Sequence, residues 1–208
     1  MFSGIVQENG TVKNLEFRDE ILSLTIVSEE LIDSLKEGSS VSVNGCCLTV
    51  VEVLENSFKV EVTEETLKKT NLSNLRKDSK VNLELPLKVG DRIDGHLVLG
   101  HVDTIGKVSG IESFGENTIV TILFKREFKK YIAPKGSITV NGVSLTIVEV
   151  KADLKQDPVL SFTLIPFSRD NTNLGSLKID DAVNLEMDII SRYLVNYVES
   201  EKVIKNYA

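Results

Sequence analysis

Short runs in which apolar and polar residues alternate recur along the chain. Examples are ILSLTIV (residues 21–27), KVNLELPL (80–87) and ENTIVTILF (116–124). Alternation with a period of two is typical of strands that bury one face. Because helical patterns are scarce and turn-forming residues separate the runs, we expect an all-β fold with a small barrel or sandwich in each half of the chain.

Two segments are expected to be helical. Residues 28–38 begin with Ser28, which can cap a helix, and end at Gly38. Near the end of the chain, apolar residues on one helical face stand at positions 189, 190, 193, 194, 197 and 198. This second helix packs either on its own barrel or on another subunit, and the sequence leaves both arrangements open.

The chain contains an internal repeat. SVSVNGCCLTVVEV (40–53) returns as SITVNGVSLTIVEV (137–150), so that Asn44-Gly45 corresponds to Asn141-Gly142 at a spacing of 97 residues. Repeats of this kind decide the architecture and are considered before single motifs. The Asn-Gly pair within each block fits a tight hairpin turn.

Two further blocks keep the same order. GIVQENGTV (4–12) matches GHVDTIGKV (100–108) at a spacing of 96, and Val81–Glu84 matches Val183–Glu186 at a spacing of 102. The longer spacing places the extra residues in KADLKQDP (151–158), where a loop between strands tolerates insertion. The blocks together predict two similar domains of about 100 residues each.

Composition and charge exclude several classes of protein. Apolar residues at 41% and charged residues at 26% are ordinary for a globular protein, and a net charge of −7 without a Lys/Arg cluster argues against nucleic-acid binding. A leader and a membrane-spanning run are not expected, which favours a cytoplasmic protein. Adjacent cysteines and two histidines also lack the spacing of a metal site, so no metal is expected.

Cys47 and His101 are the most interesting side chains. The second repeat has Ser144 in place of Cys47, and the first repeat has Ile5 in place of His101. A free cysteine is either a small buried residue or a reactive thiol, and a histidine is either structural or a proton carrier near neutral pH. Since neighbouring side chains on a strand face opposite sides, Cys46 and Cys47 are not expected to line one pocket together.

Uncharged hydroxyl side chains recur in the two repeats, mostly at corresponding positions. They are Thr49, Thr66, Ser144, Thr146 and Ser168. Such groups suit a neutral polyhydroxylated ligand, and no glycine-rich phosphate loop is present in the sequence.

Together these blocks resemble the riboflavin synthase family (alpha chain) of lumazine-binding repeat proteins. The resemblance rests on MFSGIV, NGCCLTV, TEETLKKTNL, GHLVLGHVD, YIAPKGSITVNGVSLTIVEV and VNLEMDIISRY. It implies two similar six-stranded antiparallel β-barrels, over residues 1–97 and 98–187, and a C-terminal helix over 188–208 that assembles a homotrimer. It also implies active sites between subunits, formed by the N-terminal barrel of one and the C-terminal barrel of its neighbour.

The resemblance implies a transferase reaction, the last step of riboflavin biosynthesis. Two molecules of 6,7-dimethyl-8-ribityllumazine exchange a four-carbon unit and give riboflavin and 5-amino-6-(ribitylamino)uracil, with no metal or redox cofactor. One lumazine loses a proton from its 7-methyl group and attacks the other, which has added a nucleophile to its ring. Association with lumazine synthase is a further implied possibility. The alternative is a non-catalytic lumazine- or flavin-binding protein of the same fold.

Site residues follow from the same resemblance, position by position. Ser40, Cys47 and His101 match the proposed catalytic residues, with His101 assisting proton transfer and Cys47 positioning or activating the acceptor ring. Phe2 matches a position near the site, and Lys135 one that reaches into a neighbouring subunit. The remaining substrate-binding positions are Gly4, Ile5, Val6, Leu48, Thr49, Glu61, Val62, Thr63, Glu64, Glu65, Thr66, Gly100, Val102, Ser144, Leu145, Thr146, Thr163, Leu164, Ile165, Pro166, Phe167 and Ser168. Departures from the family pattern occur at Asp94, Leu99 and Phe167.

Overall fold

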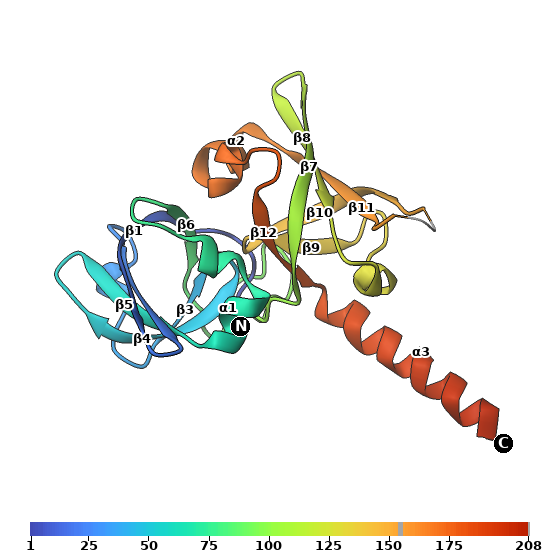
Figure 1. Ribbon diagram of the computed structural model, residues 1–208, viewed down its shortest axis with the longest axis horizontal. Helices are drawn as coiled ribbons and strands as arrows, with labels where there is room; N and C mark the ends of the chain where they lie inside the picture. Colours follow the sequence, from blue (N-terminus) through green and yellow to red (C-terminus); the bar gives the residue numbers. More distant parts are fainter. Residues whose placement is uncertain (154–155, 208) are drawn as a thin grey trace.

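The computed structural model describes residues 1–153 and 156–207, in which two closed antiparallel barrels precede a long helix (Figure 1). The strands of the first barrel are β1 (Glu8–Arg18), β2 (Ile21–Val27), β3 (Ser40–Val43), β4 (Cys46–Val53), β5 (Ser57–Val62) and β6 (Lys80–Glu84). Those of the second barrel are β7 (Thr104–Phe114), β8 (Asn117–Leu123), β9 (Ser137–Val140), β10 (Val143–Lys151), β11 (Val159–Leu164) and β12 (Ala182–Met187).

The two barrels share one topology. Hydrogen-bonded neighbours follow the order β1-β2-β5-β4-β3-β6 in the first barrel and the equivalent order β7-β8-β11-β10-β9-β12 in the second. The predicted all-β class with two six-stranded barrels and a C-terminal helix is therefore confirmed. The domain boundaries at residues 97/98 and 187/188 stay predictions. Residues 154 and 155, in the predicted insertion, and residue 208, at the end of the predicted helix, lie outside the described residues.

Each barrel has its own core, built by the alternation seen in the sequence. On β5, Phe58, Val60 and Val62 are fully buried, whereas Glu61 is exposed. On β9 and β11, Ile138 and Phe162 are fully buried in the second core. Burial of apolar side chains on one face of each strand therefore closes both barrels.

Each repeated Asn-Gly block is a hairpin. β3 and β4 are joined at Asn44 (φ 48°) and Gly45 (φ 77°), and β9 and β10 at Asn141 (φ 47°) and Gly142 (φ 80°). A positive φ at both central residues is the geometry of a type I′ turn, which Asn-Gly favours. The hairpin interpretation of this dipeptide is confirmed.

Six buried asparagines join the barrels, at positions 44, 71, 82, 141, 173 and 184, each exposed by 8% or less. Asn184 Nδ2 of β12 donates to the Asn44 carbonyl (2.8 Å), and Asn82 Nδ2 of β6 donates to the Asn141 carbonyl (2.9 Å). Each sixth strand is thus bonded to the hairpin turn of the other barrel. Asn71 Oδ1 is buried without a hydrogen-bond partner, but the bonds between the barrels allow few alternative arrangements, so this network fixes the two barrels relative to each other.

The predicted helix over residues 28–38 is not formed. Only Ile32–Ser34 make a short 3₁₀ turn. The Glu8 carboxylate accepts hydrogen bonds from Ser28 Oγ (2.5 Å) and from the backbone N–H groups of Glu29 (2.6 Å) and Leu31 (3.1 Å). These bonds hold the start of the segment, where a helix would also leave the N–H groups free. The chain leaves the helical conformation at Leu35 (φ −91°, ψ 147°), and Leu31 and Leu35 are both buried in the first core, so the segment is held as a loop.

The C-terminal helix α3 (Ile189–Tyr207) is present and projects away from both barrels (Figure 1). Ile190, Tyr193, Leu194 and Tyr197 are 61–73% exposed. A helix that packed along its own barrel would bury these side chains, so that arrangement is not the one observed. Among the described residues, no helix has the combination of length and apolar character needed to cross a membrane.

Candidate functional site

Two connecting segments, which we call the crossing segments, each contact the barrel of the other repeat: residues 1–7, before β1, and residues 85–103, between β6 and β7. The carbonyl of Gly4, which precedes β1, accepts a hydrogen bond from Ser144 N of β10 (2.7 Å). The carbonyl of Gly100, which precedes β7, accepts one from Cys47 N of β4 (2.9 Å). Val6 packs on the second core and Val102 on the first. Each barrel is therefore completed by a segment of the opposite repeat.

Both contact points require glycine. Gly4 (φ 77°) and Gly100 (φ 78°) have left-handed backbone conformations. A Cβ at Gly4 would lie 2.7 Å from Ser144 Cβ, and one at Gly100 would lie 2.6 Å from Cys47 Cβ. Only a residue without a side chain allows the backbone to approach these two strands so closely.

The first barrel has a cleft of about 200 Å³ beside Cys47. Of the predicted residues, the structure brings together Cys47, Glu65, Thr66, Gly100, His101 and Val102. Cys46, Lys69 and Thr70 line the same cleft but were not among the predicted residues. Glu65, Thr66 and Lys69 are placed there by the short helix α1 (Glu64–Lys69), which follows β5 directly.

The two cysteines differ in their surroundings, although both border this cleft. Cys46 is 4% exposed within the first core, and Cys47 is half-buried. The expectation that only one of them would line a pocket is therefore wrong in detail. Burial raises the pKa of the Cys46 thiol to about 12, which leaves Cys47 as the thiol available for chemistry.

We expect a thiol reagent to distinguish these cysteines. With a pKa of about 12, Cys46 is thiolate in only about one molecule in 10,000 at pH 8. Iodoacetamide at pH 8 should therefore alkylate Cys47 in the folded protein and Cys46 only after denaturation, as measured by peptide mass spectrometry. Equal labelling of both residues in the folded protein would show that the core does not enclose Cys46.

Several predicted residues lie away from the first cleft. Ser40 and Thr49 face each other across β3 and β4, two register positions from the Ser42 and Cys47 pair and on the same face of the sheet. Glu61 borders a separate hollow on the outside of the barrel. Leu48 and Val62 belong to the core, and Thr63 and Glu64 are exposed at the start of α1.

The second barrel has an equivalent position at Ser144, with a different partner. His96 Nδ1 lies 2.7 Å from Ser144 Oγ, and His96 N donates to the Ser3 carbonyl (3.1 Å). Burial lowers the pKa of His96, and the nearby Asp188 carboxylate opposes this effect. The sequence predicted His101 as a site residue but not His96, although both histidines lie in the segment between the repeats. The position at Cys47 has a thiol and the position at Ser144 a serine–histidine pair, so the two positions are chemically unequal.

The other predicted residues of the second barrel divide into core and surface. Leu145 and Leu164 are core residues, and Thr163 and Ser168 are half-buried. Two polar side chains, Thr146 and Lys135, are exposed. Ile5, Ile165 and Phe167 are 45–73% exposed, with Pro166 half-buried between the last two. These apolar side chains leave an open surface in one chain, and Ile5 directly follows Gly4, whose carbonyl is bonded to Ser144 N.

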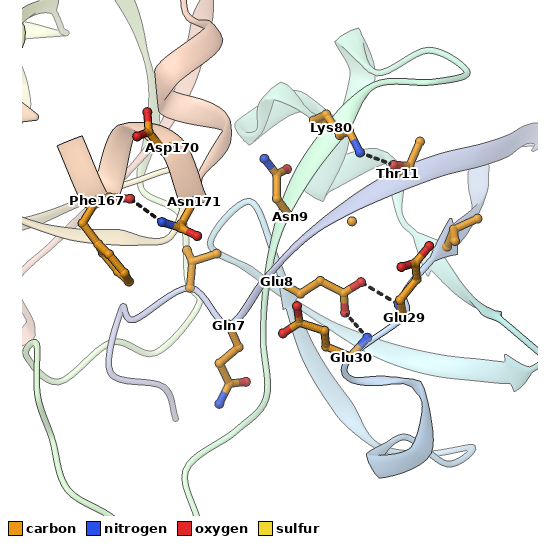
Figure 2. Close-up of a pocket in the computed structure, with 13 residues that line it drawn as sticks. Gln7, Glu8, Asn9, Thr11, Glu29, Glu30, Lys80, Phe167, Asp170 and Asn171 are labelled. Carbon is orange, nitrogen blue, oxygen red and sulfur yellow. Dashed lines mark hydrogen bonds between the residues drawn. The ribbon is translucent and has the colours of Figure 1, made fainter. Parts of the chain in front are cut away.

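A larger cavity of about 410 Å³ borders this surface, between β1 and the helix α2 (Pro166–Asn171) (Figure 2). Figure 2 shows Phe167, Asp170 and Asn171 of α2 on one side and Gln7 and Asn9 on the other. Asn171 Nδ2 donates to the Phe167 carbonyl (2.8 Å) and so braces the helix turn. The cavity therefore lies between α2, which belongs to the second barrel, and β1 of the first barrel.

Two buried carboxylates hold the crossing segments, and the sequence interpretation missed them. Glu84 accepts hydrogen bonds from Ser3 and Gly4, and Glu186 accepts them from Leu99 and Gly100. Both stand at the end of the repeated Val-Asn-Leu-Glu block, which was used only to align the repeats. The sequence carries only the repetition of a glutamate in register, and its burial is known from the structure alone.

Comparison with known families defines the class of this protein. The profile of the lumazine binding domain matches residues 3–86 and 99–188, one match for each barrel. Both barrels are therefore lumazine-binding domains, and the crossing segments lie partly within the matched regions.

Curated relatives specify the family. The riboflavin synthase of Mycobacterium tuberculosis is 39% identical over 201 residues, covering 96% of this chain and 99% of the relative. That of Bacillus subtilis is 36% identical over 198 residues, covering 95% of this chain and 90% of the relative. The chain belongs to the riboflavin synthase family, which confirms the resemblance seen in the sequence.

Solved structures share the two-barrel fold. LumP complexed with 6,7-dimethyl-8-(1'-D-ribityl) lumazine is similar at 26% identity, with a TM-score of 0.80 over 90% of this chain and 99% of LumP. LumP complexed with riboflavin gives a TM-score of 0.83 at the same identity and coverage. The two-barrel frame of this chain is thus shared with a protein that binds both molecules.

Proposed function

We propose that this enzyme converts two molecules of 6,7-dimethyl-8-ribityllumazine into riboflavin and 5-amino-6-(ribitylamino)uracil. The observation that carries the proposal is the pair of equivalent but unequal positions, one at Cys47 and one at Ser144, each walled by a glycine of the opposite repeat. A reaction between two copies of one substrate needs two similar sites that treat the copies differently. The duplicated barrel with a thiol in one site and a serine–histidine pair in the other meets that need.

The reaction is balanced by its two substrates alone. The four-carbon unit that leaves one lumazine completes the benzenoid ring formed on the other, so the products contain every atom of the two substrates. Neither an oxidant nor a reductant is consumed. The protein has to hold the two rings together, and such positioning contributes up to about 7–11 kcal/mol in favourable cases.

We assign roles to two side chains of the first cleft. In the first cleft, His101 is exposed beside Cys47 and Thr66, where it can carry a proton from the 7-methyl group of a bound ring or return one. Cys47 positions or activates the acceptor ring, and the ring that exchanges a proton with His101 is the second lumazine, stacked against the acceptor. Ser40 does not line this cleft in one chain, so Cys47 and His101 are the proposed catalytic pair here, and the catalytic role of Ser40 stays a prediction.

The proposed enzyme is a homotrimer with its active sites between subunits. The exposed apolar face of α3 supports this proposal, because Ile190, Tyr193, Leu194 and Tyr197 have no cover within the described chain. The open surface formed by Ile5, Ile165 and Phe167 supports it as well, since a ring stacked there needs a second wall. We propose that the first cleft of a neighbouring subunit supplies that wall. A cytoplasmic location and association with lumazine synthase stay predictions.

Mixed trimers test this arrangement. Gly100→Ala is expected to inactivate the first cleft and Gly4→Ala the second, because each new Cβ collides with the adjacent strand. The separate variants should be nearly inactive. When the two are unfolded and refolded together in equal amounts, about a quarter of the interfaces should pair two intact sites, if subunits assort randomly around a ring. Riboflavin formation should then return to about that fraction of the wild-type rate.

No recovery in refolded mixtures that contain trimers would mean that the productive pair forms within one chain. A monomer in sedimentation would contradict the trimer directly. A monomer that held lumazine tightly without turnover would instead favour the alternative, a non-catalytic binding protein of the same fold. LumP, which shares this fold, has been solved with a bound lumazine.

A further inference from the structure

The two buried carboxylates Glu84 and Glu186 occupy equivalent places in the two barrels. Glu84 ends β6 and Glu186 lies on β12, and their side chains are 3% and 2% exposed. Among the described residues neither carboxylate has an ion-pair partner. A buried carboxylate without a cation is costly unless several donors satisfy it.

The donors come from the crossing segments. Glu84 Oε1 accepts from Ser3 N (2.8 Å) and Ser3 Oγ (2.9 Å), and Glu84 Oε2 accepts from Gly4 N (3.1 Å). Glu186 Oε1 accepts from Leu99 N (2.8 Å) and Glu186 Oε2 from Gly100 N (2.9 Å). Burial raises the pKa of both carboxyl groups, and these hydrogen bonds oppose that effect.

Each held segment then contacts the site of the other barrel. The Gly4 carbonyl is bonded to Ser144 N, while the Gly4 N–H is bonded to Glu84. The Gly100 carbonyl is bonded to Cys47 N, while the Gly100 N–H is bonded to Glu186. A carboxylate of one barrel thus sets the position of a glycine that walls the site of the other barrel.

We propose that Glu84 is a positioning residue for the second-barrel lumazine site and Glu186 a positioning residue for the first-barrel site. This inference rests on the proposed function, because it takes the surroundings of Ser144 and Cys47 as the two ligand sites. The assignment is crossed: each glutamate acts on the site that its own barrel does not contain. Glu84 has a second route to Ser144, since Ser3 also accepts from His96 N, and His96 Nδ1 lies beside Ser144 Oγ.

The test compares Glu84→Gln with Glu186→Gln in the full-length protein. Glutamine keeps the size and one acceptor oxygen but turns an amino group toward one donor. Riboflavin, which does not turn over alone, is titrated while NMR follows the backbone amides of Ser144 and Cys47 as separate reporters. Glu84→Gln should weaken riboflavin binding at Ser144 about tenfold and leave binding at Cys47 within about twofold. Glu186→Gln should show the reverse, so each variant is the control for the other.

Loss at both sites in both variants would overturn the inference in favour of a purely structural role. Weakening at the site of the same barrel would overturn the crossed assignment. If either glutamine variant fails to fold, Ser3→Ala removes one donor to Glu84 and should weaken only the Ser144 site.

Hydrogen exchange without ligand separates this inference from the proposed function. Glu84→Gln should speed amide exchange at Gly4 and Ser144, and Glu186→Gln should speed exchange at Gly100 and Cys47. Wild-type protein that binds riboflavin at neither site would contradict the proposed function, whereas unchanged exchange in both variants would contradict the positioning roles.

Discussion

Gly100→Ala is expected to lower turnover of lumazine by about a hundredfold, because misplacing a reacting group by about 1 Å has an effect of that size. The added Cβ would lie 2.6 Å from Cys47 Cβ and 2.9 Å from Cys47 N, so either β4 or the crossing segment must move. Cys47 and His101 line the cleft at this contact, and both would shift relative to the bound ring. Steady-state kinetics with 6,7-dimethyl-8-ribityllumazine measure the loss.

Gly38→Ala is the matched control for this variant. Gly38 has a similar backbone conformation (φ 82°), but a Cβ there would have no atom within 4 Å. It therefore has the same backbone strain, about 1–2 kcal/mol of stability, without the collision. Turnover of Gly38→Ala should stay within about twofold of wild type. An equal loss in both variants would mean that strain, and not the wall at Cys47, explains the effect.

Asn184→Ala is expected to reduce the free energy of unfolding by about 3 kcal/mol, since it leaves two buried groups without partners. Asn184 Oδ1 accepts from Asn71 N (2.6 Å), and its Nδ2 donates to the Asn44 carbonyl (2.8 Å). Both partners are buried between the barrels, with Asn44 1% and Asn71 6% exposed. Equilibrium unfolding in guanidinium chloride measures the change.

Asn14→Ala provides the comparison for the amide network. Asn14 is exposed, and its Nδ2 donates to Glu16 Oε1 at 2.8 Å on the surface of β1. Its removal should change the free energy of unfolding by less than about 0.5 kcal/mol. If Asn184→Ala were equally mild, the asparagines would not be what fixes the two barrels together.

The fold was predictable because its determinants are local and repeated. Alternation marked most strands, Asn44-Gly45 marked a hairpin turn, and the spacing of apolar residues marked α3. The helix expected at residues 28–38 is absent because the chain becomes extended at Leu35, where Leu31 and Leu35 are buried in the first core. A single sequence carries no signal for such a tertiary contact.

The site was predictable only in part. Cys47, Thr66 and His101 do meet in one cleft, but Ser40 lies farther along β3 and does not line it. The contact of each crossing segment with the other barrel was not predicted, because the sequence does not show which strand the backbone at Gly4 or at Gly100 will contact. His96 and the two buried glutamates follow from that contact. They become visible as site residues only when the path of the chain is known.

The proposed reaction is tested most directly by its stoichiometry. Purified protein, treated with a chelator, is mixed with 6,7-dimethyl-8-ribityllumazine as the only organic substrate, and both pigments are followed by absorbance. One riboflavin should form for every two lumazines consumed, without any added cofactor. Binding of lumazine with no riboflavin formed would contradict the proposed reaction and would place this chain with proteins that only bind the pigment.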